Sequence, residues 1–216
     1  MAKKKSEYVR KTILDAAVKV VAQKGYYNAK TAEIAKQAGV ASGTIYNYFK
    51  GKDDILISVF NERLGDMVAT LRGAMKRMED VDSKISLIVT SVMQLFQTDR
   101  DLAEILVVEL RQSAKFLKST AMLKLLEFLE LIEEVIIEGR SRGMYRKEVD
   151  PAMIAVLLVG CMEAVLSMWI ISDLVPEFKK KYDYTPAEAS EAVLDLWQFE
   201  LRTEEERQTR MAARKR

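Results

Sequence analysis

Apolar residues recur every three to four positions along most of this chain, and no stretch shows the strict alternation of a half-buried β-strand. In the first such stretch, Ile13, Ala17 and Val20 fall on one face of a helix. Only three of the 216 residues are proline, and Ala, Leu, Glu and Lys are abundant, which favours helices further. We therefore expect an all-α protein with about nine helices.

The same pattern sets the bounds of the expected helices. They lie at residues 8–24, 31–38, 42–49, 53–78, 82–98, 102–116, 119–142, 151–173 and 186–201. Gly25 and Gly39 end the first two helices, and Pro151 and Pro186 stand in the first turn of the last two. The remaining expectations are loops at residues 141–150 and 174–185 and a frayed helix or disordered tail at residues 202–216.

The chain contains no histidine, which excludes Ser-His-Asp catalysis and imidazole metal sites. Its single cysteine, Cys161, lies in an apolar run, so it is expected to be a small core residue and no disulfide forms within the chain. The candidate carboxylate pair Asp53-Asp54 stands at a helix start, where the helix dipole explains it. We expect no catalytic residue, no metal site and no cofactor, and hence no enzyme.

The most apolar stretch, residues 153–171, approaches the length of a membrane span but is interrupted by Glu163. Because 31% of the residues in the chain are charged, this stretch fits a buried subunit-interface helix better than a membrane helix. No apolar segment typical of a secretory signal follows the basic N-terminus. We therefore expect a cytoplasmic protein without membrane contact.

Charge is unevenly distributed along the chain, although the net formal charge is only +2. Residues 1–52 carry eleven Lys and Arg against three Asp and Glu. Residues 53–201 carry seventeen against twenty-six, and residues 202–216 carry six against three. A basic segment ahead of an acidic one predicts that the N-terminal segment binds a polyanion such as nucleic acid.

Residues 31–49 are a candidate helix–turn–helix. The two expected helices are joined by Gly39-Val40-Ala41, a short connection of the kind that lets the second helix enter the major groove of DNA. Val40 and Ile45 are the expected apolar contacts to the first helix. A plain helical bundle explains these apolar residues as well, but it does not explain the polar face of the second helix.

The stretch IAKQAGVASGTIYNYFKGKDDIL resembles the DNA-binding signature of the TetR family of bacterial transcriptional repressors. The resemblance runs from about residue 10 to residue 56. The residues at the family's spacing are Ile34, Ala35, Gly39, Val40, Gly43, Tyr46, Phe49 and Lys52. The resemblance implies an N-terminal three-helix DNA-binding domain (residues 1–52), a helical effector-binding and dimerisation domain (residues 53–203) and a charged tail (residues 204–216).

The resemblance also implies roles for single residues of the DNA-binding domain. Gly43 lets the backbone approach DNA closely. Base readout is expected from Ser42, Thr44 and Asn47. Asn47 can recognise adenine through two hydrogen bonds. Phosphate contacts are expected from Tyr46, Tyr48 and Lys52.

One departure from the family concerns the start of the second helix. The family usually has a Ser or Thr there that caps the helix and contacts phosphate, but alignment on Ile34 places Ala29 and Lys30 at those positions. Asn28 or Thr31 is a candidate cap instead, and Lys30 can supply a cationic phosphate contact. The N-terminal MAKKKSE either adds salt-dependent, non-specific affinity or is a solvated tail.

Members of this family normally form dimers through their last two helices, which here are residues 151–173 and 186–201. The first of these is apolar on nearly every side, and such a helix must be covered on all sides. One domain of this size cannot cover it, so we expect a homodimer. Two-fold symmetry then implies a palindromic double-stranded operator.

A polar cluster interrupts the apolar helix LAEILVVELRQSAKFL. Glu109, Arg111 and Gln112 either pair with a neighbouring helix or bind the head group of a ligand. ELRQS, with EGxxxG at residues 138–143 and GxxExxxxxW at residues 160–169, resembles the acyl-CoA-responsive fatty-acid-degradation regulators of the family. Arg111 would then meet the anionic CoA portion. The expected acyl-chain contacts are Met93, Leu106, Met162 and Leu166. Ordinary core packing explains these four residues as well.

Two functions are compatible with these features. The first is a repressor of fatty-acid metabolism that long-chain acyl-CoA releases from its operator. The second is a TetR-type repressor of an efflux system that senses lipophilic drugs. Arg111 discriminates between them, because only a CoA thioester requires a cation at that position. A helical adaptor that does not bind DNA is disfavoured by the segregated charge.

Overall fold

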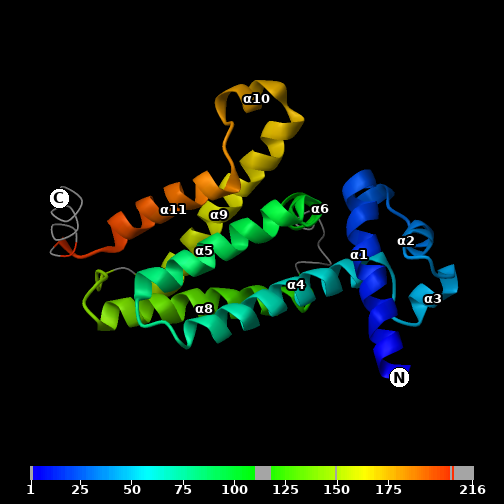
Figure 1. Ribbon diagram of the computed structural model, residues 1–216, viewed down its shortest axis with the longest axis horizontal. Coiled ribbons are helices and arrows are strands. Elements are labelled where there is room, and N and C mark those ends of the chain that lie inside the picture. Colours follow the sequence, from blue (N-terminus) through cyan, green and yellow to red (C-terminus); the bar gives the residue numbers. More distant parts are fainter. Residues whose placement is uncertain (1, 110–117, 149, 205, 207–216) are drawn as a thin grey trace. The chain divides into compact units, whose positions relative to one another are not determined.

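The computed structural model describes residues 2–109, 118–148, 150–204 and 206 (Figure 1). These residues form ten α-helices and one π-helical turn, and an isolated antiparallel bridge pairs Tyr145 with Arg202. The expected all-α class is confirmed, with one α-helix more than the nine expected. The chain divides into two compact units: unit 1, Met1–Asp66 with Asp99–Leu125, and unit 2, Met67–Thr98 with Leu126–Arg216.

Unit 1 contains the N-terminal helices and a segment from the middle of the chain. Its elements are α1 (Ala2–Asn28), α2 (Thr31–Gln37), α3 (Ser42–Tyr46), the first part of α4 (Lys52–Met75), α6 (Arg100–Glu104), the π-helical turn η1 (Ile105–Glu109) and the start of α8 (Ala121–Ser141). The fully buried aliphatic residues of its N-terminal part are Ile13, Ala17, Val21, Ile34, Ile45, Ile55 and Leu56. Both α6 and η1 pack against α1.

Two glycines shape the N-terminal helices as expected. Gly25 has a φ of 75° and interrupts the helical geometry of α1, so only residues 26–28 lie beyond the kink. Gly39 has a φ of 68° and turns the chain after α2, where the Val40 N–H donates to the Ala35 carbonyl at 3.0 Å. Helix α3 is shorter than expected, because it ends at Tyr46 instead of residue 49.

Two other segments also differ from the expected helices. The helix expected at residues 102–116 starts earlier, at Arg100, because the Asp99 carboxylate accepts the Leu102 N–H at 3.1 Å. It changes to π-helical geometry at Ile105, and residues 110–117 lie outside the described residues. The prediction of a loop throughout residues 174–185 is wrong, since this segment contains α10 (Pro176–Lys181). None of the residues of α10 is buried, so no apolar periodicity marked it.

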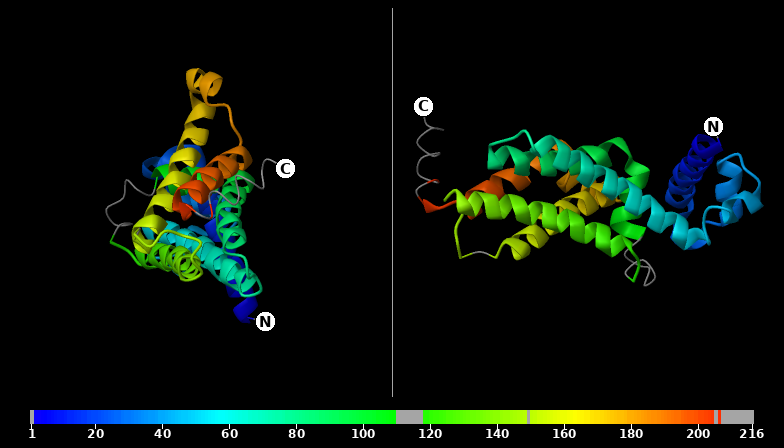
Figure 2. Two further views of the ribbon diagram at one scale, coloured as in Figure 1. Left: turned by 90° about the vertical axis from the view of Figure 1, so that its left-hand side faces the viewer. Right: turned by 90° about the horizontal axis from the view of Figure 1, so that it is seen from below.

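Unit 2 contains the second part of α4, α5 (Val81–Thr98), most of α8, α9 (Pro151–Leu174), α10 and α11 (Pro186–Leu201). Helices α9 and α11 pack against α5 and against each other (Figure 2). Helix α11 has the expected bounds, and Thr185 and Glu188 form a capping box that sets its start. The Glu188 carboxylate accepts the Thr185 N–H at 2.7 Å, and this bond lowers the pKa of Glu188.

A buried ion pair joins the end of α11 to the start of α5. Arg202 and Asp82 are 2% and 5% exposed, and the guanidinium donates to the carboxylate. The Tyr145 hydroxyl also donates to Asp82, at 3.1 Å, and burial together with the Asp82 charge raises the pKa of Tyr145. The Arg146 N–H donates to the Leu201 carbonyl at 2.9 Å. These bonds fix the loop after α8 to the end of α11.

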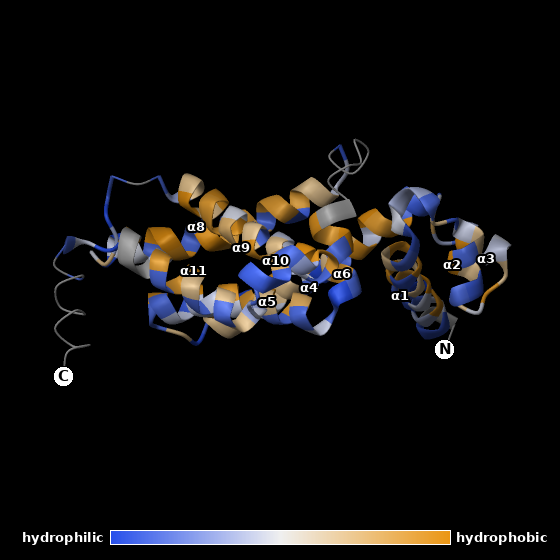
Figure 3. Cartoon of the chain, turned by 90° about the horizontal axis from the view of Figure 1, so that it is seen from above, coloured by the Kyte–Doolittle hydropathy of each residue, from blue (hydrophilic) through white to orange (hydrophobic). Residues whose placement is uncertain are grey.

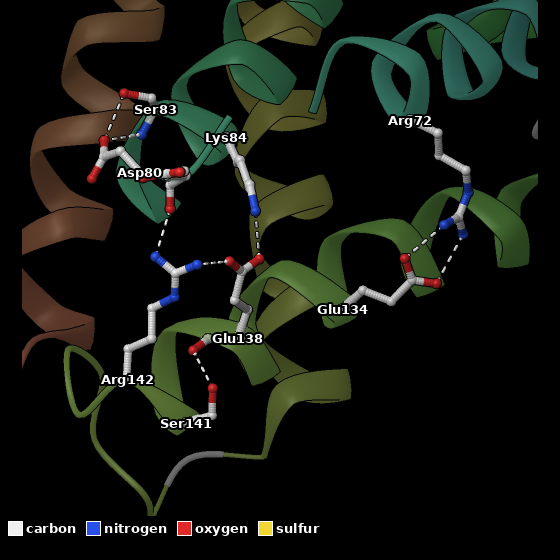
Figure 4. Close-up of polar contacts among 9 residues, drawn as sticks. Arg72, Asp80, Ser83, Lys84, Glu134, Glu138, Ser141 and Arg142 are labelled. Carbon is white, nitrogen blue, oxygen red and sulfur yellow. Dashed lines mark hydrogen bonds and ion pairs between the residues drawn. The ribbon is translucent and has the colours of Figure 1, made fainter. Parts of the chain in front are cut away.

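Glu138 is the centre of an ion-pair cluster on α8 (Figure 4). Its carboxylate binds Lys84 of α5 at 2.6 Å and Arg142, one turn later, at 2.5 Å. Nearer the start of α8, Glu134 accepts two hydrogen bonds from Arg72 of α4, at 2.6 and 3.0 Å, and these bonds raise the pKa of Arg72. Ion pairs therefore connect α8 to both α4 and α5 within unit 2.

Both glycines of the EGxxxG stretch have roles in the fold. A Cβ atom on Gly139 would lie 2.3 Å from the ring of Tyr145, so only glycine leaves room for this buried side chain. Gly143 has a φ of 74°, which glycine adopts without strain in the turn after α8. The spacing of the two glycines thus follows from packing and turn geometry.

We expect Gly139→Ala to destabilise the protein by about 1–3 kcal/mol, because the added methyl group must displace the buried Tyr145 ring. Thermal unfolding followed by circular dichroism measures this effect. Gly73→Ala on α4 is the matched control, since a Cβ atom there meets no atom within 4 Å and alanine favours a helix. Equal melting temperatures for the Gly139→Ala variant and the unmodified protein would contradict the packing role.

Candidate DNA-binding surface

Helix α3 and the residues after it have a buried apolar side and an exposed polar side. Ile45 is fully buried, and Phe49 is 3% exposed. The predicted DNA contacts on the other side are Ser42, Gly43, Tyr46 and Asn47, which are exposed, and Thr44 and Tyr48, which are half-buried. The structure therefore gathers six of the nine predicted DNA contacts on residues 42–48.

Two further predicted contacts lie at the start of α2. The Thr31 hydroxyl is 3.3 Å from the Tyr46 hydroxyl, so the first residue of α2 and the last residue of α3 meet. Lys30, the residue before α2, is exposed. Two hydroxyls and an ammonium group are donors that a phosphate oxygen accepts.

Lys52, the ninth predicted contact, has partners within unit 1. Its ammonium donates to the backbone carbonyls of Tyr26 and Tyr27, the second at 3.3 Å, and lies 4.5 Å from the centre of the Tyr26 ring. The Tyr26 hydroxyl donates to Asp53. These contacts close the end of α1 onto the start of α4, a structural role for Lys52 that sequence reasoning missed.

Glu33 was also missed, although it stabilises the start of α2. Neither Asn28 nor Thr31 caps this helix; instead the Glu33 carboxylate accepts the Lys30 N–H at 3.1 Å. Its other oxygen binds the Lys24 ammonium at 2.6 Å. The bond from Lys24, followed by that from Lys30, lowers the pKa of Glu33. Its position three residues after Lys30 is the capping-box spacing, which was the available sequence signal.

Three interactions join α1 to α4 and to the residue that anchors α3. Arg63 binds Asp15 at 2.7 Å, and Arg10 binds Glu62. The Arg10 guanidinium also lies 5.2 Å from the centre of the Phe49 ring. Unit 1 therefore supports residues 42–49 with charged contacts as well as an apolar core.

The predicted effector contacts are distributed over unit 1, unit 2 and residues outside the described part of the chain. Met93, Met162 and Leu166 are buried in unit 2, each no more than 2% exposed. Leu106 is half-buried in η1 of unit 1. Glu109 ends η1, but its side chain lies outside the described residues, as do Arg111 and Gln112. The described part of the chain contains no group of three acidic or cysteine side chains that could hold a metal ion.

Comparison with known proteins identifies the family. The family described as bacterial regulatory proteins, tetR family, matches residues 13–59, and the C-terminal region of the YsiA-like proteins matches residues 60–196. The chain belongs to the TetR family. It is therefore a transcriptional regulator with an N-terminal helix–turn–helix, as the signature predicted, and the expectation that it is not an enzyme is confirmed.

Relatives of known role cover nearly the whole chain. The fatty acid metabolism regulator protein of Bacillus subtilis (strain 168) is 33% identical over 196 residues, which are 91% of this chain and 96% of the relative. The structure of fatty acid degradation regulator FadR from Bacillus halodurans has a TM-score of 0.80 and 33% identity, over 88% of this chain and 94% of that one. FadR from Bacillus subtilis in complex with stearoyl-CoA has a TM-score of 0.78 and 32% identity, over 86% and 96%.

A more distant neighbour shares the fold alone. SmeT, the repressor of the Stenotrophomonas maltophilia multidrug efflux pump SmeDEF, has a TM-score of 0.69 and 19% identity, over 90% of this chain and 91% of that one. A repressor of an efflux pump and a fatty acid degradation regulator thus share this architecture. The fold does not discriminate between the two functions considered above.

The contacts of Glu33 predict a dependence of stability on pH. The contacts of the folded state lower the pKa of Glu33 below its usual value of 4.5. Glu33 therefore contributes its full stabilisation at a pH above 4.5, and this contribution is lost as the pH falls through the folded-state pKa. Glu33→Gln should therefore melt at a lower temperature than the unmodified protein at pH 7. The difference in melting temperature between the two proteins should narrow below about pH 4.5. Thermal unfolding at a series of pH values measures this difference.

Lys36→Gln is the control, because it removes an exposed charge from the same helix and leaves the Glu33 carboxylate in place. A difference between Glu33→Gln and the unmodified protein that is independent of pH from 3 to 7 would contradict the role of the carboxylate.

Proposed function

We propose that this regulator is a repressor of fatty-acid metabolism genes and that a long-chain acyl-CoA releases it from its operator. The observation that carries this proposal is the 33% identity to a fatty acid metabolism regulator over 91% of the chain. A similar structure at 32% identity contains stearoyl-CoA. The efflux alternative has weaker support, since the efflux repressor with the same fold is only 19% identical.

The proposed domains are residues 1–52 for DNA binding, residues 53–203 for effector binding and dimerisation, and residues 204–216 as a charged tail. The two family regions meet at residues 59 and 60, within α4. Helix α4 begins at Lys52 in unit 1 and ends at Met75 in unit 2, which makes it the proposed lever between DNA and effector. Because binding is reciprocal, an effector that weakens DNA binding is itself bound more weakly by the DNA complex.

The proposed base contacts are Ser42, Thr44 and Asn47, and the proposed phosphate contacts are Lys30, Thr31, Tyr46, Tyr48 and Lys52. Asn47 and Tyr46 are exposed, which supports a contact of each with DNA. Gly43 is exposed, and a Cβ atom there would meet nothing within 4 Å, so packing within the chain does not require glycine. Close approach of an external DNA backbone is a reason for glycine at this position.

Asn47→Ala should reduce discrimination between the operator and mutated operators, because a bidentate contact to adenine contributes about 1–3 kcal/mol to specificity. Tyr46→Phe removes one phosphate donor and should weaken binding to all these duplexes by a similar factor. Binding titrations against single-base operator variants separate the two effects. Uniform weakening by Asn47→Ala would contradict its role in base readout.

We also propose that the protein is a cytoplasmic homodimer that binds a palindromic operator, with α9 and α11 at the interface. Helix α9 is apolar along most of its length (Figure 3), and only 33% of its most apolar 18-residue window is buried in the single chain. Its length and composition alone would also permit a membrane span. One of its faces carries the exposed apolar and small residues Met153, Val156, Leu157, Gly160, Ala164, Ile171 and Leu174. Sedimentation velocity tests the dimer, and a monomeric mass would contradict it.

For the effector we propose Arg111, with Glu109 and Gln112, as the CoA contacts, and Met93, Leu106, Met162 and Leu166 as the acyl-chain contacts. Arg111→Ala should raise the concentration of stearoyl-CoA that releases half of the operator DNA by tenfold or more, since a charged hydrogen bond contributes about 1.5–3 kcal/mol. Fluorescence anisotropy of labelled operator measures the release.

The free fatty acid is the matched ligand control, because it lacks the CoA phosphates. If the same concentration of stearoyl-CoA released the unmodified protein and the Arg111→Ala variant from operator DNA, the proposed role of Arg111 would be contradicted. Release by lipophilic drugs, but by no acyl-CoA, would favour the efflux alternative.

A further inference from the structure

One face of α1 carries three lysines that the helix–turn–helix does not use. Lys4, Lys11 and Lys19 are exposed, and Tyr8, which lies between the first two, is 72% exposed. Their spacing of four, three and eight residues places all four side chains on one side of the helix. We call this set the lysine stripe. Among the described residues, none of the three lysines takes part in a salt bridge.

A carboxylate in the same face is neutralised by a partner elsewhere. Asp15 lies between Lys11 and Lys19 on this side of α1, but its oxygen binds Arg63 of α4 at 2.7 Å. Arg10 and Glu62 also pair with each other, on the side of α1 that packs on α4. The charge that the stripe presents to a partner is therefore that of its lysines.

The stripe borders a shallow groove that continues to α2. Tyr8, Lys11, Thr12, Lys19 and Gln37 line this groove, which has a volume of about 330 Å³, together with Asp15 and Ala16. Gln37 is the last residue of α2, directly before the turn that leads to α3. The stripe thus borders the end of α2, within unit 1.

The length of the stripe suits a regular polyanion. Fifteen residues separate Lys4 from Lys19, which corresponds to about 22 Å along a helix. Duplex DNA carries about one negative charge per 1.7 Å of its axis, so a stripe of this length meets several phosphates. Lysine and tyrosine side chains are common phosphate donors, and such contacts add affinity without reading sequence.

We propose that the lysine stripe is a second DNA-contact surface, which binds phosphates of the duplex that flanks the sequence read by α3. This inference rests on the proposed operator binding and extends it to a longer footprint. Flanking phosphates are favoured over an acidic protein partner because the stripe contains a single large apolar side chain, that of Tyr8, to anchor an apolar interface. The expected contribution is electrostatic and independent of the flanking sequence.

The test compares two duplexes at several salt concentrations. One duplex contains only the operator core, selected from a random library with the unmodified protein, and the other adds about ten base pairs of arbitrary sequence on each side. For the unmodified protein, the plot of log affinity against log salt should be steeper on the flanked duplex, by roughly 2–3 for each bound subunit. The Lys4→Gln/Lys11→Gln/Lys19→Gln variant should lose this difference and keep its affinity for the core.

Lys179→Gln/Lys180→Gln/Lys181→Gln on α10 is the matched control, since it removes the same charge from exposed lysines of unit 2. This control should retain the steeper slope on the flanked duplex. The inference would be overturned if the salt slope of the unmodified protein were equal on both duplexes. It would also be overturned if both triple variants lost the steeper slope on the flanked duplex to the same extent. Failure of the library to yield any preferred core would instead contradict the proposed operator binding. Circular dichroism verifies that both variants are folded.

Discussion

The candidate DNA-binding segment, residues 42–49, depends on the burial of Ile45 and Phe49 in unit 1. Helix α3 has five residues, far fewer than the roughly 12–15 that an isolated helix needs for stability in water. Tertiary packing therefore has to supply the stability, and Ile45 at 0% and Phe49 at 3% exposure supply it from the two ends of residues 45–49. Arg10 covers the Phe49 ring while its guanidinium binds Glu62. This anchoring leaves the polar side chains of residues 42–48 without a structural task in the core.

Charged contacts position the helices around this core, and those of Lys52 changed the interpretation of a predicted residue. Lys52 was expected to hold a phosphate, yet its ammonium caps the carbonyls of Tyr26 and Tyr27. The lysine ammonium has three N–H donors. A contact to a DNA phosphate therefore needs the third N–H, or it must replace one of the two hydrogen bonds to the carbonyls. The proposed phosphate role of Lys52 is therefore weaker than that of Tyr46, whose hydroxyl is exposed beside Thr31.

The EGxxxG stretch at residues 138–143, which contributed to the resemblance to acyl-CoA-responsive regulators, has a structural role. Glu138 binds Lys84 and Arg142, Gly139 makes room for the Tyr145 ring, and Gly143 forms the following turn. Tyr145 in turn donates to Asp82, which also binds Arg202. The stretch is therefore explained by the packing of α8, α5 and the end of α11. It supports the fold shared with the fatty-acid regulators and says nothing of their ligand.

Sequence reasoning succeeded where local patterns decide the structure and failed where distant contacts decide it. Helix α11 had the expected bounds because Thr185, Pro186 and Glu188 specify its start locally. Helix α10 was missed because none of its residues is buried. The partners of Lys52 and Asp82 lie 26 and 120 residues away in sequence, so no pattern of spacing could reveal them.

The buried state of the proposed acyl-chain contacts sets an energetic requirement on the effector. Met93, Met162 and Leu166 are already packed, so an acyl chain must displace side chains to reach them. A chain of about sixteen methylenes gains about 13 kcal/mol on leaving water, at about 0.8 kcal/mol for each. Shifting a two-state equilibrium from 1:99 to 99:1 requires a difference of about 5.5 kcal/mol. As an upper limit, with the whole gain acting on the released state alone, more than half of it remains to offset the repacking. At the same limit an acyl chain of six methylenes, with about 5 kcal/mol, could not supply even the shift. This physical limit favours long-chain over short-chain thioesters.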